Sequence, residues 1–251
     1  GPYFVKNGDY WYLFLSYGGL KAASGYHMRV FRSKNLTGPY VDQNGKSAIY
    51  TSGGDNVSGD VGYKLLGNYQ WSEMSSGEVA QGHNSAFVDT DGKMYVVYHT
   101  RYNNGTEWHN VRTHQLYINA DGWPVTAVND YQGETISKTG YSKEEMVGTY
   151  RVLYHKLNID YSNLECATEQ EICLNADGTI TGTYNGTWTY TAGKAYVTLK
   201  IVGTEYKGVF AKGAIAENSS PVMTFTASGR NVAIWGKKVP DAKLSATYSF
   251  D

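Results

Sequence analysis

The chain has 251 residues, with 22 Lys and Arg against 23 Asp and Glu and a formal net charge of -1 at pH 7. That length is enough for one large domain or two ordinary ones. A near-neutral charge without a Lys/Arg block argues against a nucleic acid or an anionic membrane as the main partner, because both need a concentrated basic face. An aromatic share of 14% beside only 18% charged residues favours an extracellular β protein that handles carbohydrate.

In chain order, the sequence predicts short β-strands closed by tight turns. Asn-Gly and Asp-Gly pairs accept the positive φ angles of tight hairpins. They begin at Asn7, Asn44, Asp91, Asn104, Asp121, Asp177 and Asn185. Segments between them are rich in β-branched and aromatic residues, as at 10–15, 28–32, 93–98 and 195–201. A capping-box pattern at 142–146 predicts one helical turn, and the rest of the chain predicts an all-β protein.

One strand pattern occurs twice in the first half of the chain. The order strand, turn, longer strand, loop, strand is predicted for 1–33 and again for 82–119, the second copy following an insertion at 47–80. Repeated meanders of this kind are typical of β-propeller blades. Two blades cannot close a ring, which usually needs roughly 4–8. We therefore expect further blades outside this chain, and its opening at Gly1 without an initiator Met fits a fragment or a mature product.

From about residue 147 the pattern changes to short strands joined by hairpins. Eight strands are predicted at 148–154, 170–174, 179–184, 187–190, 195–202, 206–211, 222–226 and 232–237. Their spacing predicts an antiparallel β-barrel or sandwich. We therefore divide the chain into two C-terminal propeller blades (1–130), a connector (131–145) and an accessory barrel-like domain (146–251). Cys166 and Cys173 flank a loop of this domain, and the sequence leaves open whether they pair.

The mouth of the predicted propeller is the expected place for a ligand site. The innermost strand of each blade runs along the central channel, and the repeat places Gly1 and Pro2 at its mouth in one blade and residues 82–85 in the other. Such positions gather polar groups from distant blades around a small polar ligand. His83 would then point at the axis. It could bind a ligand or metal there, or be a buried histidine with backbone partners.

An ordered series of motifs extends over essentially the whole chain. It comprises Gly-Pro-Tyr at 1–3, Leu-Ser-Tyr-Gly-Gly at 15–19, Tyr-His-Met-Arg-Val-Phe-Arg-Ser at 26–33, Thr-Gly-Pro-Tyr at 37–40, Lys-Leu-Leu-Gly-Asn-Tyr at 64–69, Gly-His-Asn-Ser at 82–85, Tyr-His-Thr-Arg at 98–101 and Val-Arg-Thr-His-Gln-Leu at 111–116. This series resembles the last two blades of family 43 glycoside hydrolases, specifically the two-domain arabinanases. The resemblance implies the last two blades of a five-bladed β-propeller followed by a C-terminal β-barrel-like domain.

The resemblance also implies hydrolysis of α-1,5-linked L-arabinan with inversion. Inversion needs a general acid and a general base on carboxyl groups about 6.5–9.5 Å apart. In the family the general-acid Glu immediately precedes the Gly-Pro with which this chain begins, so it is expected just before Gly1. We therefore expect no catalytic carboxylate in this chain, an N-terminal propeller fragment that supplies them as a second chain, and no activity of this chain alone. A plant-wall polymer as substrate implies a secreted protein, extracellular or periplasmic.

Residue by residue, the resemblance assigns five candidate site residues. His83 matches the axial metal ligand of the family, whose ion is usually assigned as calcium. Calcium prefers oxygen ligands, so the identity of the cation stays open. Tyr17, Gly18, Asn84 and Ser85 are predicted to bind substrate, with Tyr17 as a wall that stacks on the sugar or bonds its hydroxyls, and Gly18 where backbone approaches the sugar. Packing at a blade interface would explain Tyr17 equally well.

Other charged residues of the two blades have structural interpretations. Surface charge in a solvated loop is expected for Asp55, Asp60, Glu73 and Glu78, and a role in hairpin turns for Asp89, Asp91 and Asp121. Buried charge pairs between blades are expected for Arg29, Arg32, Arg112 and His114. The alternative function is a non-catalytic carbohydrate-binding fragment whose tyrosines form a sugar platform.

Overall fold

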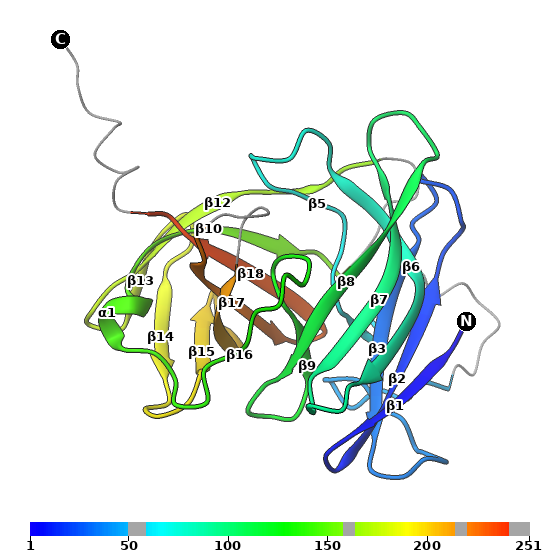
Figure 1. The fold of residues 1–251 in the computed structure, drawn as a ribbon, viewed down its shortest axis with the longest axis horizontal. Coiled ribbons are helices and arrows are strands. Elements are labelled where there is room, and N and C mark those ends of the chain that lie inside the picture. The colour runs from blue at the N-terminus through cyan, green and yellow to red at the C-terminus, as the bar shows by residue number, and fades with distance from the viewer. Residues whose placement is uncertain (50–58, 158–163, 214–219, 241–251) are drawn as a thin grey trace.

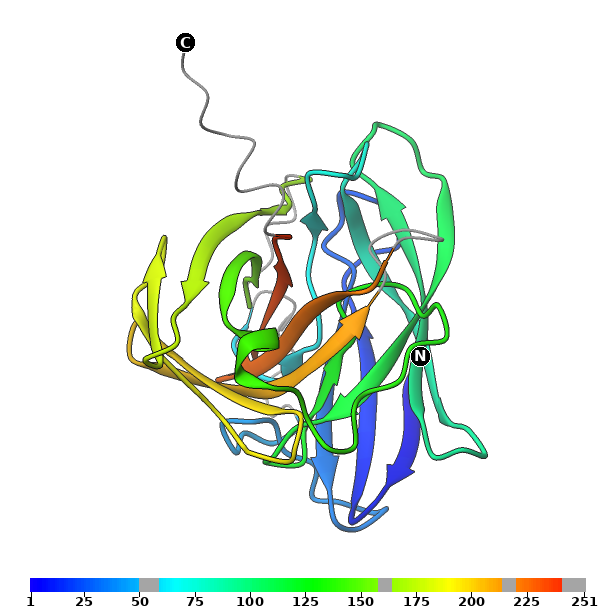
Figure 2. The same cartoon turned by 60° about the vertical axis from the view of Figure 1, so that its left-hand side comes forward.

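A computed structural model describes residues 1–49, 59–157, 164–213 and 220–240. Two sheets, antiparallel except for one pair of strands, form its N-terminal part and a closed barrel its C-terminal part, and the two parts lie side by side (Figures 1 and 2). Within these ranges the one helix is α1 (Lys143–Met146). The prediction of an all-β protein is confirmed. No helix in the described ranges is long and apolar enough to cross a membrane.

The first sheet is the first predicted meander with one additional strand. Its order is β1-β2-β3-β4, with bounds β1 (Tyr3–Asn7), β2 (Tyr10–Tyr17), β3 (His27–Ser33) and β4 (Tyr63–Lys64). Asn7 pairs with Tyr10 across the predicted Asn-Gly turn, where Gly8 has a φ of 57°. The short β4 comes from the segment between the two repeats and was not predicted, because two residues are too few to show a period.

The second sheet contains the second meander together with a strand from the C-terminal part of the chain. Its order is β11-β5-β6-β7-β8-β9, with bounds β5 (Tyr69–Gln70), β6 (Glu78–Val88), β7 (Met94–Tyr102), β8 (His109–Ile118), β9 (Pro124–Thr126) and β11 (Ala167–Thr168). The strand β6 begins four residues before its predicted start. The parallel pairing of β11 with β5 means that a loop of the accessory part completes the edge of this sheet.

The C-terminal part is a closed eight-stranded barrel, so the predicted alternative of a sandwich is wrong. Its order is β10-β12-β13-β14-β15-β16-β17-β18, and the bounds are β10 (Gly148–His155), β12 (Gln170–Leu174), β13 (Thr179–Gly182), β14 (Gly186–Tyr190), β15 (Tyr196–Ile201), β16 (Thr204–Gly213), β17 (Val222–Gly229) and β18 (Val232–Lys238). Closure follows from pairing of the first strand with the last, Tyr150 opposite Lys238. It removes the sheet edges that an open sandwich would expose.

Alternation along the barrel strands separates two cores. In β10, Tyr150 and Val152 face the barrel interior, while Leu153 faces outward. Leu153 and Trp235 of β18 join the core of the two sheets and are fully buried there. A buried indole removes a large apolar area from water. The barrel is therefore docked onto the sheets through its outer wall.

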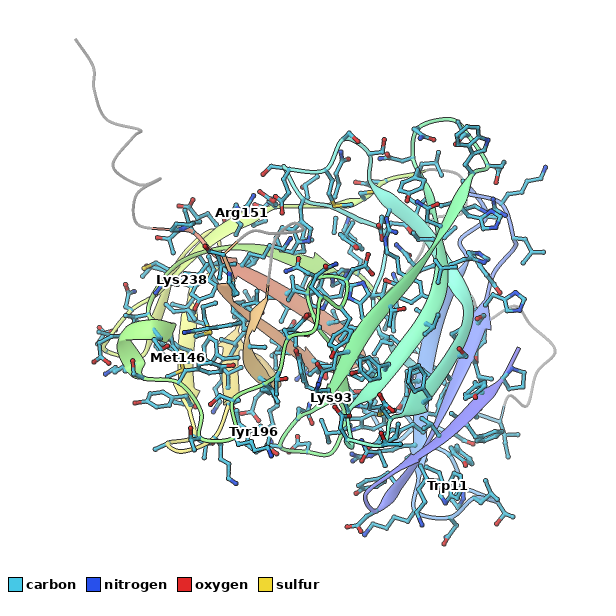
Figure 3. The ribbon with its side chains drawn as sticks, in the orientation of Figure 1. Trp11, Lys93, Met146, Arg151, Tyr196 and Lys238 are labelled. Atoms are coloured by element: carbon cyan, nitrogen blue, oxygen red, sulfur yellow. The ribbon has the colours of Figure 1, made fainter. Side chains whose placement is uncertain are left out.

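The junction between the barrel and the sheets also contains a groove. Lys93 of the second sheet and Tyr196 of the barrel (Figure 3) line a cavity of about 520 Å³ together with Tyr117 and Gln115. Another part of its wall comes from the segment between β9 and α1. That segment ends at Ser142, whose hydroxyl caps α1 and accepts from the Glu145 N–H as the capping-box pattern predicts.

Cys166 and Cys173 are both free, so they do not form the disulfide that the sequence left open. The Cys166 thiol lies at the second sheet, 3.6 Å from the Asn103 amide. Cys173 lies in β12 of the barrel, where its thiol is 3.3 Å from Oδ1 of the Asn175 side chain. Burial raises the pKa of the Cys166 thiol to about 11, which makes it a poor nucleophile near neutral pH.

Candidate functional site

The predicted mouth residues lie on a double irregularity of β6. Its pairing register with β7 shifts between Val79 and Gly82 and again between Gly82 and Ser85. Ala80 and His83 there have φ angles of 54° and 51°, uncommon values for residues other than glycine. Bulges of this kind redirect side chains and are frequent next to active sites. Here the bulge turns His83 out to solvent, whereas its neighbours in β6 are buried.

A polar cluster from both sheets holds the backbone of His83. The Ser16 hydroxyl at the end of β2 donates to Asn84 Oδ1 at 2.8 Å and accepts the His83 N–H at 3.0 Å. The Tyr26 hydroxyl accepts from the same N–H at 3.1 Å. The buried Asn84 Nδ2 has no partner among the described residues. A buried donor of this kind fits the predicted contact between Asn84 and a hydroxyl-bearing ligand.

Three imidazoles follow one another across this region. The ring centres of His83 and His99 are 6.3 Å apart, and those of His99 and His109 5.5 Å. Burial, and then the charge of Arg101, lowers the pKa of His99, so that its ring is neutral at physiological pH. Sequence reasoning missed Ser16, Tyr26 and His99, although each belongs to a motif of the recognised series.

The resemblance implies a calcium site at His83, which the side chains near His83 would have to form. The described residues contain no group of three His, Cys, Asp or Glu side chains placed to hold a metal ion. Calcium takes 6–8 oxygen ligands, whereas this region offers imidazoles. These residues therefore do not by themselves fit a calcium site, and His83 stays a predicted single ligand.

Tyr17 is held by the chain itself. Its ring stacks on His27 with 5.7 Å between ring centres, and the Arg29 guanidinium lies 5.8 Å from the same ring centre. His27 is fully buried, and its Nε2 accepts from Arg29 Nε at 2.8 Å. Burial, followed by the charges of Lys64 and Arg29, lowers the pKa of His27 well below its usual range. The half-exposed Tyr17 ring thus rests on a rigid neutral base, and its contact with a sugar stays a prediction.

Gly18 and Ser85 differ in what the structure shows of their roles. Gly18 has a φ of 88°, and a Cβ there would lie 2.4 Å from the Gly25 carbonyl oxygen. The close approach that requires glycine is therefore made by the chain's own loop, and the predicted approach of a sugar is not needed to explain it. Ser85 is half-buried and lies opposite Val97, one residue past Asn84.

Glu78 does not lie in a solvated loop, so that prediction is wrong. Its carboxylate is only 3% exposed and accepts from Arg112 Nε at 2.6 Å and from the Tyr69 hydroxyl at 3.0 Å. Arg112 also pairs with Asp130 at 3.1 Å. Burial opposes the charge of Arg112, but these two carboxylates outweigh it and raise its pKa. The sequence missed this because Glu78 begins β6, whose first five residues are all buried in the structure.

The other candidate carboxylates are also engaged. Glu73 is exposed in a turn, as predicted, and it also pairs with Arg151 and Lys237 of the barrel, at 2.9 Å each. Asp60 is exposed and pairs with Lys46, as expected of surface charge. Asp55 lies outside the described residues.

The predicted position in hairpin turns is confirmed for all three turn aspartates. Asp89 and Asp91 accept backbone N–H groups within their own turn. Asp121 instead uses its carboxylate outside its hairpin, pairing with Lys207 of the barrel at 2.9 Å.

The prediction of charge pairs between blades is wrong for the described contacts. Arg112 pairs within the second sheet. Arg32 does connect the sheets, but its guanidinium lies over the rings of Tyr10 and Trp123, 4.2 Å and 4.1 Å from their centres. His114 stacks on Trp235 of the barrel with 6.0 Å between ring centres. At Arg32, aromatic faces take the place of a carboxylate, because they solvate the cation at a smaller desolvation cost.

Arg29 also donates to neutral groups among the described residues. Besides His27, it donates to the carbonyl oxygens of Gly59, at 2.7 Å, and of Val61. It therefore ties the strand β3 to the segment that leads into β4, on the buried side of the first sheet.

Comparison with protein families divides the chain in two. Residues 1–124 match glycosyl hydrolases family 43, and residues 128–236 match the C-terminal lipocalin-like domain of the same family. An extracellular endo-alpha-(1->5)-L-arabinanase of Thermotoga petrophila is 40% identical over 96% of this chain and 53% of its own length. An extracellular endo-alpha-(1->5)-L-arabinanase 2 of Bacillus subtilis is 38% identical over 95% of this chain and 52% of its own length.

Solved structures agree with these matches. The endo-1,5-alpha-L-arabinanase of Thermotoga petrophila in complex with TRIS superposes with a TM-score of 0.87 at 41% identity, covering 96% of this chain and 55% of that one. A family 43 glycoside hydrolase of Bacillus licheniformis gives a TM-score of 0.86 at 40% identity, covering 95% and 55%. The chain thus spans about half the length of the relatives it matches. It belongs to family 43 of the glycosyl hydrolases.

Proposed function

We propose that this chain is part of an inverting glycosidase that hydrolyses α-1,5-linked L-arabinan. The proposal rests on the match to an endo-arabinanase structure at a TM-score of 0.87 and 41% identity across 96% of this chain. That match extends over both sheets and the barrel. The relatives named extracellular support secretion of this protein.

The two sheets are, in this proposal, the last two blades of a five-bladed propeller. Their shared strand order and their connection through Ser16 and Asn84 support the assignment. Relatives of about twice this length leave room for the further blades. His83 would lie at the axis because the bulge of β6 directs it away from the sheet core.

The acid and base are proposed to come from outside this chain, on an N-terminal propeller fragment. In support, the carboxylates of Glu73 and Glu78 are locked in ion pairs, so neither can exchange a proton with a substrate at little cost. In this proposal the chain orients the sugar. Asn84 Nδ2 donates to a hydroxyl of the sugar, while Ser16 and Tyr26 hold the backbone of β6 in place. His83 would give one imidazole to an axial cation, calcium or another ion, whose other ligands would come from outside the described residues.

Hydrolysis of linear α-1,5-arabinan tests this function, with linear β-1,4-xylan as the control substrate. We expect no turnover by the chain alone, turnover after addition of the polypeptide carrying the earlier blades, and inverted anomeric configuration of the first product by NMR. Turnover by the chain alone would refute the division of catalytic groups. Arabinan binding with no turnover by the reconstituted protein would establish the carbohydrate-binding alternative.

The predicted cation is tested separately by metal analysis. The reconstituted protein should hold one equivalent of calcium that His83→Ala loses, while urea unfolding of the variant stays unchanged because the side chain is exposed. Equal metal content in both proteins would remove His83 from the ligand set.

A further inference from the structure

The two ends of the barrel differ in how they are filled. At the end where β10 begins, Met146 of α1 packs into the barrel core, and the Tyr150 hydroxyl donates to the Met146 carbonyl at 2.6 Å. The middle is filled by large side chains such as Phe210 and Phe225. Gly236 is required there, because a Cβ would lie 2.2 Å from the Phe225 ring. The described residues leave the opposite end, where β10 finishes, hollow.

A cavity of about 280 Å³ occupies this second end. Its lining includes the side chains of Tyr154, Tyr184, Tyr206, Thr204, Ile201 and Ile234. The rings of Tyr154 and Tyr206 meet edge to face, 6.5 Å apart. The mouths of small β-barrels are recurrent ligand sites, and an eight-stranded barrel has room for one small ligand.

The side chains that line the cavity favour a neutral ligand. None of the described residues that line the cavity carries a charge, although the charge of Arg230 acts on Tyr206 from outside the lining. Burial of an ionic group among these uncharged side chains would therefore cost its desolvation. Burial raises the pKa of the Tyr184 and Tyr206 phenols, which keeps them protonated and able to donate. Aromatic rings and aliphatic side chains offer apolar faces beside these hydroxyls. That combination complements a sugar ring, with C–H faces and hydroxyls at its edge.

The rim of the cavity contains a residue in an unfavourable backbone conformation. Val202 follows Ile201 at the tip of the hairpin between β15 and β16, with a φ of 47° and a side chain 82% exposed. A left-handed conformation is a genuine outlier for a β-branched residue. Asn-Gly is the favoured pair in such a two-residue turn, and Val202-Gly203 takes its place here. Strain of this kind is characteristic of functional sites, and the isopropyl group extends the apolar wall of the cavity.

We propose that this end of the barrel binds one neutral sugar unit, an arabinofuranosyl residue of the substrate polymer. The inference rests on the proposed function for the identity of the sugar, and on the cavity for its existence. The barrel would hold one sugar of an arabinan chain while another part of the same arabinan chain reaches the propeller mouth. The barrel would thus act as a second contact that raises the local concentration of polymer.

The test measures binding of α-1,5-arabinotriose to the full chain by calorimetry and by NMR shifts of the Ile201 and Ile234 methyl groups. We expect those methyl signals to shift, and Tyr184→Ala to weaken binding about tenfold. Val202→Asn should weaken it about threefold while raising the thermal midpoint, because Asn tolerates this backbone conformation. Tyr190→Ala is the matched control, since Tyr190 lies on β14 outside the cavity lining. Galacturonic acid should bind more weakly than any neutral sugar of similar size.

Each alternative outcome is decisive. Unchanged affinity in both Tyr184→Ala and Val202→Asn, or no shift of the Ile201 and Ile234 methyl signals, overturns the barrel site. If Tyr184→Ala does not fold, Val202→Asn decides alone. Equal shifts with xylotriose and arabinotriose would keep the sugar site while removing its link to arabinan. A failure of hydrolysis by the reconstituted protein contradicts the proposed function only, because these binding measurements do not depend on turnover.

Discussion

Asn231 fixes the barrel to the first sheet through the hairpin between β17 and β18. It is fully buried, with a φ of 70°. Its Nδ2 donates to Asp42 Oδ2 at 2.7 Å and to the Asp60 carbonyl at 3.0 Å, and its Oδ1 accepts the Gln43 N–H at 3.0 Å. One side chain therefore satisfies polar groups on the opposite face of the junction. We predict that Asn231→Ala loosens this junction.

The expected loss follows from these contacts. A hydrogen bond to a charged group contributes about 1.5–3 kcal/mol and a neutral one about 0.5–1.5 kcal/mol. The left-handed backbone conformation costs a residue such as alanine about 1–2 kcal/mol more than glycine or asparagine. Asn231→Ala should thus lower the free energy of unfolding by about 4–6 kcal/mol by these magnitudes. Asn231→Gly removes the same hydrogen bonds without the backbone penalty, and should lose about 1 kcal/mol less.

Urea unfolding followed by tryptophan fluorescence measures the free energy of unfolding of both variants. The dependence of that free energy on urea concentration is expected to stay unchanged. Asn44→Ala is the control: Asn44 lies in the turn that follows Gln43, but its side chain is exposed, so a change within about 0.5 kcal/mol is expected. The reasoning is refuted if both Asn231 variants stay within about 1 kcal/mol of the parent chain. An equal loss in the Gly and Ala variants would refute the backbone contribution alone.

Three further predictions concern buried groups. Glu78→Gln should lower the free energy of unfolding by about 3 kcal/mol in urea, because Arg112 keeps its charge without its 2.6 Å partner. Gly82→Ala would place a Cβ 2.3 Å from the Tyr26 ring, and overpacking of about 1–3 kcal/mol should lower the thermal midpoint. Burial lowers the pKa of His155 from 6.5 to about 3, so the unfolded state binds its proton first. Stability should be full above about pH 6.5 and fall by up to about 1.4 kcal/mol per pH unit toward pH 3.

Each of these has an outcome that contradicts it. Glu78→Gln within about 1 kcal/mol of the parent would show that the buried pair is replaceable. An unchanged thermal midpoint in Gly82→Ala would mean that the Tyr26 ring can move aside without cost. If the stability of His155→Gln falls with decreasing pH as steeply as that of the parent chain, another group causes this loss of stability.

The strands of the barrel were predictable, but the sheets were only partly so. All eight barrel strands follow from hairpins and alternation, which are local properties of the sequence. β4, β5 and β11 did not show in the sequence because each has two residues and forms only where a distant partner supplies hydrogen bonds. The pairing of β11 with β5 joins residues about 100 positions apart, a separation at which local patterns carry no information.

The candidate site shows the same division. His83 and Asn84 were found through a motif, whereas their geometry depends on the bulge of β6 and on Ser16 from the other sheet. Glu78 was misplaced because its neighbours are polar in the sequence, while its partner Arg112 lies 34 positions away. Burial of a charge depends on such a partner, and a partner is a property of tertiary structure.

The sequence by itself determined the all-β class, the two-part organisation, the barrel strands and the family, because turn residues, alternation and ordered motifs are written in consecutive positions. Only the tertiary structure decided that the barrel is closed, that Cys166 and Cys173 are apart, and that the candidate carboxylates are engaged in ion pairs. Among the described residues, it also shows a cavity at one end of the barrel. Those features arise from contacts between residues far apart in the chain, whose free energies exist only once the strands have paired and packed.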